Sequence, residues 1–243
     1  MRRGLFSSVM LVLASCRVEA GCADPAALAQ STVSITRYFD AKEKEARPGV
    51  LGMSGTAWFL SPTSIVTVEH VATAMNLSDH IWKPLEIWTG ENKQSIAARI
   101  RRLVGSRVEK IALLELQGPF PHAQGFQLRA APLLPQEHLV SLAYPDDHLR
   151  VAGGRFVQYG EGDKLAGMAL LEMYDGDDRL VLDYGSSGAP VFDCAGRVAA
   201  VVSKLFVTSI HFMSRTMRLP TPWGSPNVVS LPIEEPKDFA RVE

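Results

Sequence analysis

The sequence predicts an all-β protein that consists of two six-stranded antiparallel barrels. The first observation behind this prediction is that short β-branched and aromatic runs alternate with turn signals along the chain. The second is that heptads, internal repeats and long amphipathic helices are absent from the sequence. The third is a Pro- and Ala-rich stretch at residues 119–135, which separates two groups of about six strands and is typical of a linker.

The first group of strands forms a predicted N-terminal barrel at residues 31–118. Its opening run is rich in β-branched and aromatic residues, and a Ser-Pro-Thr turn at 61–63 separates the second strand from the third. The segment 40–47 is charged, and we expect it to be a solvated connection. The predicted strands of this barrel are 32–39, 55–59, 64–68, 85–88, 96–104 and 111–116.

The second group of strands forms a predicted C-terminal barrel at residues 136–243. Turn signals at 145–147 and 175–177 separate several of its apolar runs, and each turn contains two Asp residues. The predicted strands of this barrel are 139–143, 155–159, 168–174, 180–183, 189–193, 197–204 and 227–232.

Composition and charge exclude several classes of function. Hydrophobic residues make up 47% of the 243 residues, so the chain can bury a core and is not expected to be disordered. The net charge of −1 provides no broad positive field for nucleic acid. No run of eighteen apolar residues predicts a transmembrane span. The sequence lacks CxxC and Cys/His clusters, so we expect no metal and no cofactor.

The first twenty residues have the layout of a secretory signal peptide. Arg2 and Arg3 give a basic start, an apolar stretch follows at 5–14, and small or modest side chains precede residue 21. A second interpretation is that residues 1–15 are removed and Cys16 is lipidated, because Leu-Ala-Ser-Cys resembles a bacterial lipobox. Both interpretations predict an exported protein, either periplasmic or secreted, and the second makes it a membrane-anchored lipoprotein.

Two cysteines remain after removal of residues 1–20. Cys22 and Cys194 are able to pair as a disulfide in an oxidising compartment. The alternative is that Cys194 is a free buried thiol, and the sequence alone does not decide between the two.

One segment, at residues 183–192, has the composition of a nucleophile loop. Ser187 lies in a turn just before a predicted strand, with Gly185 and Gly188 close to it. A nucleophilic serine needs an exposed hydroxyl and nearby backbone N–H groups for the oxyanion, and glycines permit such a tight loop. The alternative interpretation is an ordinary β-turn that is rich in small residues.

A second segment favours the catalytic interpretation. His70 ends an apolar strand and begins what is predicted to be a single helical turn, and the sequence Gly-Thr-Ala-Trp-Phe precedes it at 55–59. Together with the serine loop, these segments resemble the trypsin-like (chymotrypsin-fold) serine peptidases of the bacterial exported type. The resemblance extends to the segments 140–145 and 193–203, and it covers roughly residues 31–232.

This resemblance implies a serine endopeptidase that acts on protein or peptide substrates from a site between the two barrels. Ser187 would attack the scissile carbonyl, and His70 would remove its proton and later return it to the leaving group. The backbone N–H groups of Gly185 and Ser187 would form the oxyanion hole. Ala189 replaces the second glycine of the family motif, which is a change of only one methyl group.

The acidic member of the triad departs from the family pattern. The family has an Asp immediately before a buried strand, and in strict register Lys110 stands at that place. Glu109 is one residue away, and a shift of one residue in a strand turns a side chain to the opposite face. Three interpretations therefore stay open: a triad with Glu109, a Ser-His dyad, and an inactive homologue that binds a peptide or a partner protein.

The same resemblance indicates three residues of the substrate pocket. Val181 lies six residues before Ser187, where trypsin has an Asp, so a preference for Arg or Lys is disfavoured. Ser203 and Lys204 are expected to border the pocket, and Lys204 would favour an acidic substrate residue if it pointed inward.

Overall fold

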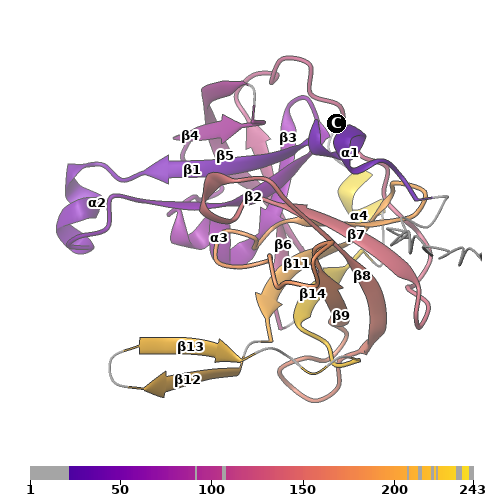
Figure 1. The fold of residues 1–243 in the computed structure, drawn as a ribbon. Helices are drawn as coiled ribbons and strands as arrows, with labels where there is room; N and C mark the ends of the chain where they lie inside the picture. Colours follow the sequence, from indigo (N-terminus) through magenta and orange to yellow (C-terminus); the bar gives the residue numbers. More distant parts are fainter. Residues whose placement is uncertain are drawn as a thin grey trace, which may run out of the picture.

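The computed structural model describes residues 22–90, 92–105, 108–206, 208–212, 215–219, 222, 224–233 and 237–240. In this part of the chain the strands form two closed antiparallel barrels of six strands each. Figure 1 shows the first barrel, in indigo and magenta, above the second barrel. The predicted fold class is therefore confirmed.

The first barrel closes through the order β1-β2-β3-β6-β5-β4. Strand β3 is buried along its whole length, and it pairs with β6 from Ser64 opposite Glu115 to Val68 opposite Ile111. Strand β3 also contacts β11 of the second barrel, so it lies where the two barrels meet. The strands are β1 Thr32–Tyr38, β2 Gly52–Ser61, β3 Ser64–Val68, β4 Lys83–Trp88, β5 Lys93–Gly105 and β6 Lys110–Leu116.

The second barrel closes through the order β10-β11-β14-β9-β8-β7. Its strand β11 is buried from Val198 to Ser203 and becomes exposed at Lys204. Lys204 contacts Glu109 of the first barrel. The strands are β7 His138–Ala143, β8 Arg150–Tyr159, β9 Ala169–Tyr174, β10 Pro190–Asp193, β11 Val198–Leu205 and β14 Val228–Pro232.

The linker between the barrels takes part in the core. Phe126 packs against Trp58 of the first barrel, with 6.3 Å between ring centroids, and edge-on against Phe192 of the second, at 4.7 Å. Its backbone N–H donates to the carbonyl of Phe59, and the N–H of Val198 donates to the carbonyl of Gln127. The Pro-rich segment thus packs between the two barrels, and the apolar contacts of Phe126 with both of them stabilise their association.

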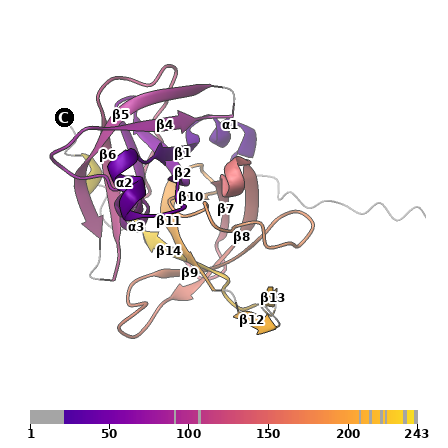
Figure 2. The same cartoon turned by 90° about the vertical axis from the view of Figure 1, so that its left-hand side faces the viewer.

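Two parts of the second barrel differ from the sequence-based prediction. Residues 180–183 form no strand, because the segment turns back on itself: the N–H of Ser186 donates to the carbonyl of Asp183 and the N–H of Asp183 donates to Ser186 Oγ. A further hairpin, β12 Thr208–Phe212 and β13 Arg215–Leu219, follows β11. It projects away from the barrel in Figures 1 and 2 and forms a separate two-stranded sheet.

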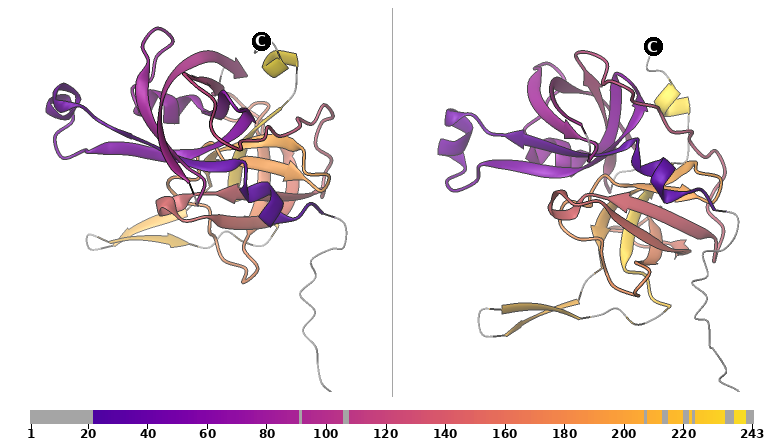
Figure 3. Two further views of the ribbon diagram at one scale, coloured as in Figure 1. Left: turned by 90° about the horizontal axis from the view of Figure 1, so that it is seen from above. Right: turned by 45° about the horizontal axis from the view of Figure 1, so that its top comes forward.

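The helices are short, and one of them lies where a simple connection was expected. Helix α2, Ala41–Ala46, begins with a capping box in which Asp40 accepts from the N–H of Glu43 and Glu43 accepts from the N–H of Asp40. Arg37 also pairs with Glu43, at 2.7 Å, which anchors the helix to β1. Figure 3 shows α2 at the tip of the long β1–β2 hairpin. The remaining helices are α1 Pro25–Ala29, α3 Glu69–Ala74 and α4 Lys237–Ala240.

The two cysteines of the described region form a disulfide. Cys22 is bonded to Cys194, and the N–H of Ala23 donates to the carbonyl of Cys194 at 3.0 Å. The bond joins the beginning of the described chain to the turn after β10, so the disulfide is the alternative that the structure adopts. Residues 1–20, with the expected signal peptide or the lipidated Cys16, lie outside the described residues.

Candidate active site

The position of His70 follows from the junction of β3 and α3. Val68 ends the strand with an extended backbone, and the helix begins at the next residue, so His70 lies in its first turn. A helix is thus present where a single helical turn was predicted, and at six residues it is longer than one turn. Val71 is buried behind the imidazole and packs so close to β2 that a Cβ on Gly55 would lie 2.7 Å from its Cγ1. His70 itself keeps 44% of its side chain exposed, which leaves the imidazole open to a substrate.

The structure brings Glu109 to His70. The Nδ1–H of His70 donates to Oε1 of Glu109, whose side chain is only 5% exposed. The other oxygen, Oε2, accepts a hydrogen bond from Ser203 Oγ and lies 3.3 Å from Lys204 Nζ. A buried carboxylate therefore has partners from both barrels, which is the condition under which such a charge is tolerated.

Lys110 does not occupy the acid's place, contrary to the strict register. Its Nζ lies 3.9 Å from Oε1 of Glu69, and its side chain is 44% exposed. The physical reason lies in the ladder: β6 begins at Lys110, which pairs with Gly105, so Glu109 precedes the paired strand. The alternation of faces applies within a ladder, and the residue before it is free to turn toward the imidazole.

The loop that carries Ser187 depends on its two glycines. Gly185 and Gly188 have φ values of +93° and +91°, a region that residues with a Cβ rarely adopt. A Cβ on Gly188 would also lie 2.0 Å from the carbonyl oxygen of Thr56, so no other residue fits there. The loop therefore packs directly against β2 of the first barrel, and Ser187 is held at the interface.

The predicted oxyanion donors are two backbone N–H groups of the loop of Ser187. In the part of the chain that the structure describes, the backbone N–H groups of Gly185 and Ser187 donate to no protein acceptor, whereas the N–H of Ser186 and that of Gly188 do. Peptide N–H groups without a partner at a half-buried loop are able to stabilise a developing oxyanion.

Thr56 holds the loop in place, a role that sequence reasoning did not assign. Its N–H donates to the carbonyl of Ser187 at 3.0 Å, and its Oγ1 donates to the carbonyl of Gly185 at 2.7 Å. The N–H of Tyr144 in turn donates to Thr56 Oγ1 at 2.9 Å. The Gly-Thr pair at 55–56 belongs to the motif that resembles the family, and it drew attention to this segment. The motif alone does not predict which groups the hydroxyl of Thr56 contacts.

The hydroxyl of Ser187 points to the second barrel in this structure. Its Oγ donates to the backbone carbonyl of Ser203 at 3.1 Å, and among the described residues no hydrogen bond joins it to His70. Ser203 therefore contacts two parts of the site: its backbone carbonyl accepts from Ser187, and its hydroxyl donates to Glu109, which accepts from His70.

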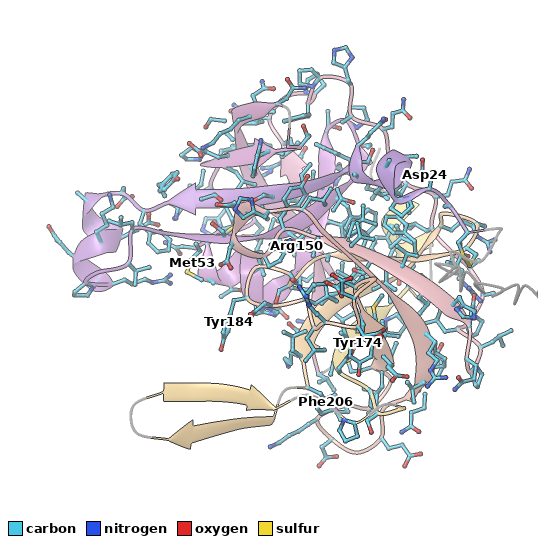
Figure 4. All side chains as sticks on the ribbon, in the orientation of Figure 1. Asp24, Met53, Arg150, Tyr174, Tyr184 and Phe206 are labelled. Carbon is cyan, nitrogen blue, oxygen red and sulfur yellow. A yellow bond between two sulfur atoms is a disulfide. The ribbon has the colours of Figure 1, made fainter. Side chains whose placement is uncertain are left out.

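The three predicted pocket residues lie around the same loop in different ways. Val181 is half-buried and packs on the core of the second barrel, whereas Ser203 and Lys204 direct their side chains to Glu109. Tyr184, just before Gly185, is 83% exposed and projects from the body of the molecule in Figure 4. Sequence reasoning did not single out Tyr184.

Comparison with known proteins decides the family. Residues 55–201, which include His70, Glu109 and Ser187, match the sequence profile of the trypsin-like peptidase domain. The chain belongs to the trypsin-like peptidase family. Among the curated proteins, none matches the sequence significantly.

Solved structures support the trypsin-like fold at low sequence identity. The active form of the Rv3671c protease from M. tuberculosis is 17% identical, with a TM-score of 0.61 over 100% of this chain and 94% of that chain. The inactive form of the same protease is 18% identical, with a TM-score of 0.55 over 89% of this chain and 91% of that chain. At such identities the likeness establishes the fold alone.

Within the described residues of this trypsin-like chain, no three His, Cys, Asp or Glu side chains form a group that could bind a metal ion. None of the described helices has the length and apolar character needed to cross a membrane.

The electrostatics of Glu109 follow from its partners. Burial by itself raises the pKa of this carboxyl, but the hydrogen bonds from His70 and Ser203 and the charge of Lys204 outweigh burial and lower the pKa to about 2. Glu109 is therefore ionised throughout the neutral range, as an acceptor for an imidazole N–H must be.

This lowered pKa predicts a pH dependence of stability. Because the pKa of Glu109 is lower in the folded protein than in the unfolded chain, its stabilisation is complete above about pH 4.5 and disappears as the pH falls through about 2. The contribution is up to about 3 kcal/mol. Glu109→Gln should lose it, so unfolding free energies of the two proteins should converge at low pH. A constant difference from pH 7 to pH 2 would contradict the assignment.

Proposed function

We propose that the protein is a serine endopeptidase that hydrolyses protein substrates through an acyl-enzyme. One observation carries this proposal: His70 and the buried Glu109 form an oriented base beside the glycine-supported loop of Ser187. Membership of the trypsin-like peptidase family supports it, and so do the unengaged N–H groups of Gly185 and Ser187.

The mechanism needs one small movement of the nucleophile. Ser187 Oγ must leave the carbonyl of Ser203, to which it donates in this structure, and donate to the imidazole of His70 instead. His70 then removes the proton as Ser187 Oγ attacks the scissile carbonyl, and the N–H groups of the loop stabilise the oxyanion. His70 returns the proton to the leaving amine, and water releases the acyl group by the reverse sequence.

Glu109 supplies orientation and charge in this mechanism. Its Oε1 fixes the tautomer in which Nδ1 carries the hydrogen, so Nε2 is the nitrogen that accepts the proton of Ser187. Its negative charge also stabilises the imidazolium that forms during attack. Glu has one methylene more than the Asp of the family. This length allows Glu109, one residue before the position where the family has its Asp, to reach the imidazole of His70.

A second candidate function is an inactive homologue that binds peptides or a partner protein. The observation that favours it is the resting hydrogen bond of Ser187 to Ser203, which leaves the hydroxyl unactivated. In apo peptidases such catalytic hydrogen bonds are commonly long or absent until the substrate binds, so the bond does not argue against catalysis.

The first prediction separates these two functions. A fluorophosphonate probe labels only an activated serine, so the native protein should be labelled at Ser187 and should cleave casein. Ser187→Ala should remove both signals, and His70→Ala should reduce them to a similar extent, because the two residues act as a unit. Ser186→Ala, in the same turn, should keep a measurable label. No labelling of a folded native protein would establish the inactive homologue.

The second prediction concerns the acid. Glu109→Gln should lower kcat by a factor of up to about 10⁴, since the amide no longer fixes the tautomer of His70. Lys110→Asp should change kcat little or lower it, because Lys110 contacts Glu69 and not the imidazole. Steady-state kinetics on one peptide substrate measures both variants. A strong gain with Lys110→Asp would show instead that position 110 is the acid's place.

We also propose that the substrate pocket does not select Arg or Lys. Val181 stands near the loop without a charge, and it packs on the apolar core of the second barrel. No carboxylate at this position is available to pair with a basic substrate side chain, so specificity rests on other features of the cleft.

Export of the protein is the remaining part of this proposal. The basic and apolar pattern of residues 1–20 supports it, and so does the disulfide between Cys22 and Cys194, a bond typical of oxidising compartments.

The third prediction tests export by mass spectrometry of material from outside the cytoplasm. The mature chain should begin near residue 21, or at a diacylated Cys16 together with membrane association. Cys16→Ser distinguishes the two, because it would release a lipoprotein from the membrane and leave an ordinary signal peptide unaffected. Intact Met1 on exported material would contradict both.

A further inference from the structure

We propose that Lys204 is a positioning residue that holds the carboxylate of Glu109 against His70. The inference rests on the proposed peptidase function and adds a residue from the second barrel to its machinery. Sequence reasoning placed Lys204 at the substrate pocket, whereas the structure places its ammonium at the acid.

The two oxygens of Glu109 have different partners. Oε1 accepts from His70, which belongs to the first barrel, whereas Oε2 faces Ser203 Oγ and Lys204 Nζ, both from β11. Ser203 Oγ donates a hydrogen bond to Oε2, and the ammonium of Lys204 forms an ion pair with the same oxygen, so Oε1 is left for the imidazole. Lys204 therefore helps to determine which oxygen of Glu109 accepts the hydrogen bond of His70. It has no described contact with His70 itself.

A glutamate has a particular need for this second anchor. Its side chain has one more rotatable bond than aspartate, so it has more conformations in which the carboxylate misses the imidazole. Burial limits these conformations, but a buried carboxylate is stable only with enough donors. Lys204 provides the opposite charge beside Oε2, and its side chain stays 55% exposed, which lowers the cost of desolvating its ammonium.

Lys110, the described lysine next to Glu109 in sequence, does not take the place of Lys204. Its Nζ lies 3.9 Å from Oε1 of Glu69 in α3, and no described ion pair joins it to Glu109. Ser203 stabilises the ionised carboxylate through its hydrogen bond but carries no charge. Lys204 adds a positive charge beside Oε2, which also lowers the pKa of Glu109.

An opposite role for Lys204 would also be physically reasonable. Its charge offsets the negative charge of Glu109 and so reduces the stabilisation of imidazolium, which would make the lysine a brake on catalysis. Positioning outweighs this effect, because a carboxylate that rotates away gives no stabilisation at all. The two roles predict opposite changes in rate.

The kinetic test compares Lys204→Met, which keeps the stem, with Lys204→Arg, which keeps the charge. We expect Lys204→Met to lower kcat about tenfold at little changed KM, and Lys204→Arg to recover most of the rate. In a Glu109→Gln background, Lys204→Met should have almost no further effect, since it acts through Glu109. Lys164→Met, at an exposed lysine between β8 and β9, is the matched control and should retain the native rate. An unchanged or higher kcat for Lys204→Met would overturn the proposal.

A spectroscopic test does not depend on catalysis. The Nδ1–H proton of His70, when it is held by Glu109, should give a resolved low-field NMR resonance at neutral pH. The resonance should weaken or disappear in Lys204→Met and persist in Lys204→Arg and Lys164→Met. Its persistence in Lys204→Met would overturn the positioning role. If the native protein fails to react with the fluorophosphonate probe, the peptidase proposal alone fails, and this resonance still decides whether Lys204 positions Glu109.

Discussion

The candidate site depends on one buried carboxylate that both barrels share. Glu109 belongs to the first barrel and accepts a hydrogen bond from His70 of the same barrel. Ser203 and Lys204 of the second barrel contact its other oxygen. Without these partners a carboxylate whose side chain is only 5% exposed would be costly to bury. The same contacts that compensate its charge therefore fix the relative position of the barrels at the place where the chemistry is proposed.

A second set of contacts supports the loop of Ser187 in the same way. The N–H and hydroxyl of Thr56 bind the carbonyls of Ser187 and Gly185, and Gly188 allows the loop to approach the backbone of β2. The loop of the second barrel is thus built on the first barrel, while the acid of the first barrel is held by the second. Each barrel therefore supplies contacts that position site residues of the other barrel, so neither barrel forms the candidate site alone.

Much of the fold was predictable because the relevant patterns are local. Runs of β-branched residues and their turns predict strands from neighbouring residues only, and the glycines around Ser187 are required by local backbone angles. The predictions that failed missed side-chain contacts that strand propensity does not describe. The segment at 180–183 is held as a loop by Ser186, and helix α2 is anchored through Glu43 by Arg37 and by Lys83 of β4.

The sequence by itself determined the two-barrel architecture, the glycine-supported loop of Ser187 and the helical start at His70, because strand propensity, glycine geometry and motif order are properties of short segments. Only the tertiary structure decided that Glu109 and not Lys110 meets the imidazole. Register predicts side-chain direction inside a ladder, and Glu109 lies just before the ladder begins. Its direction is set by Ser203, 94 residues away in the chain, and such a contact exists only after both barrels have closed.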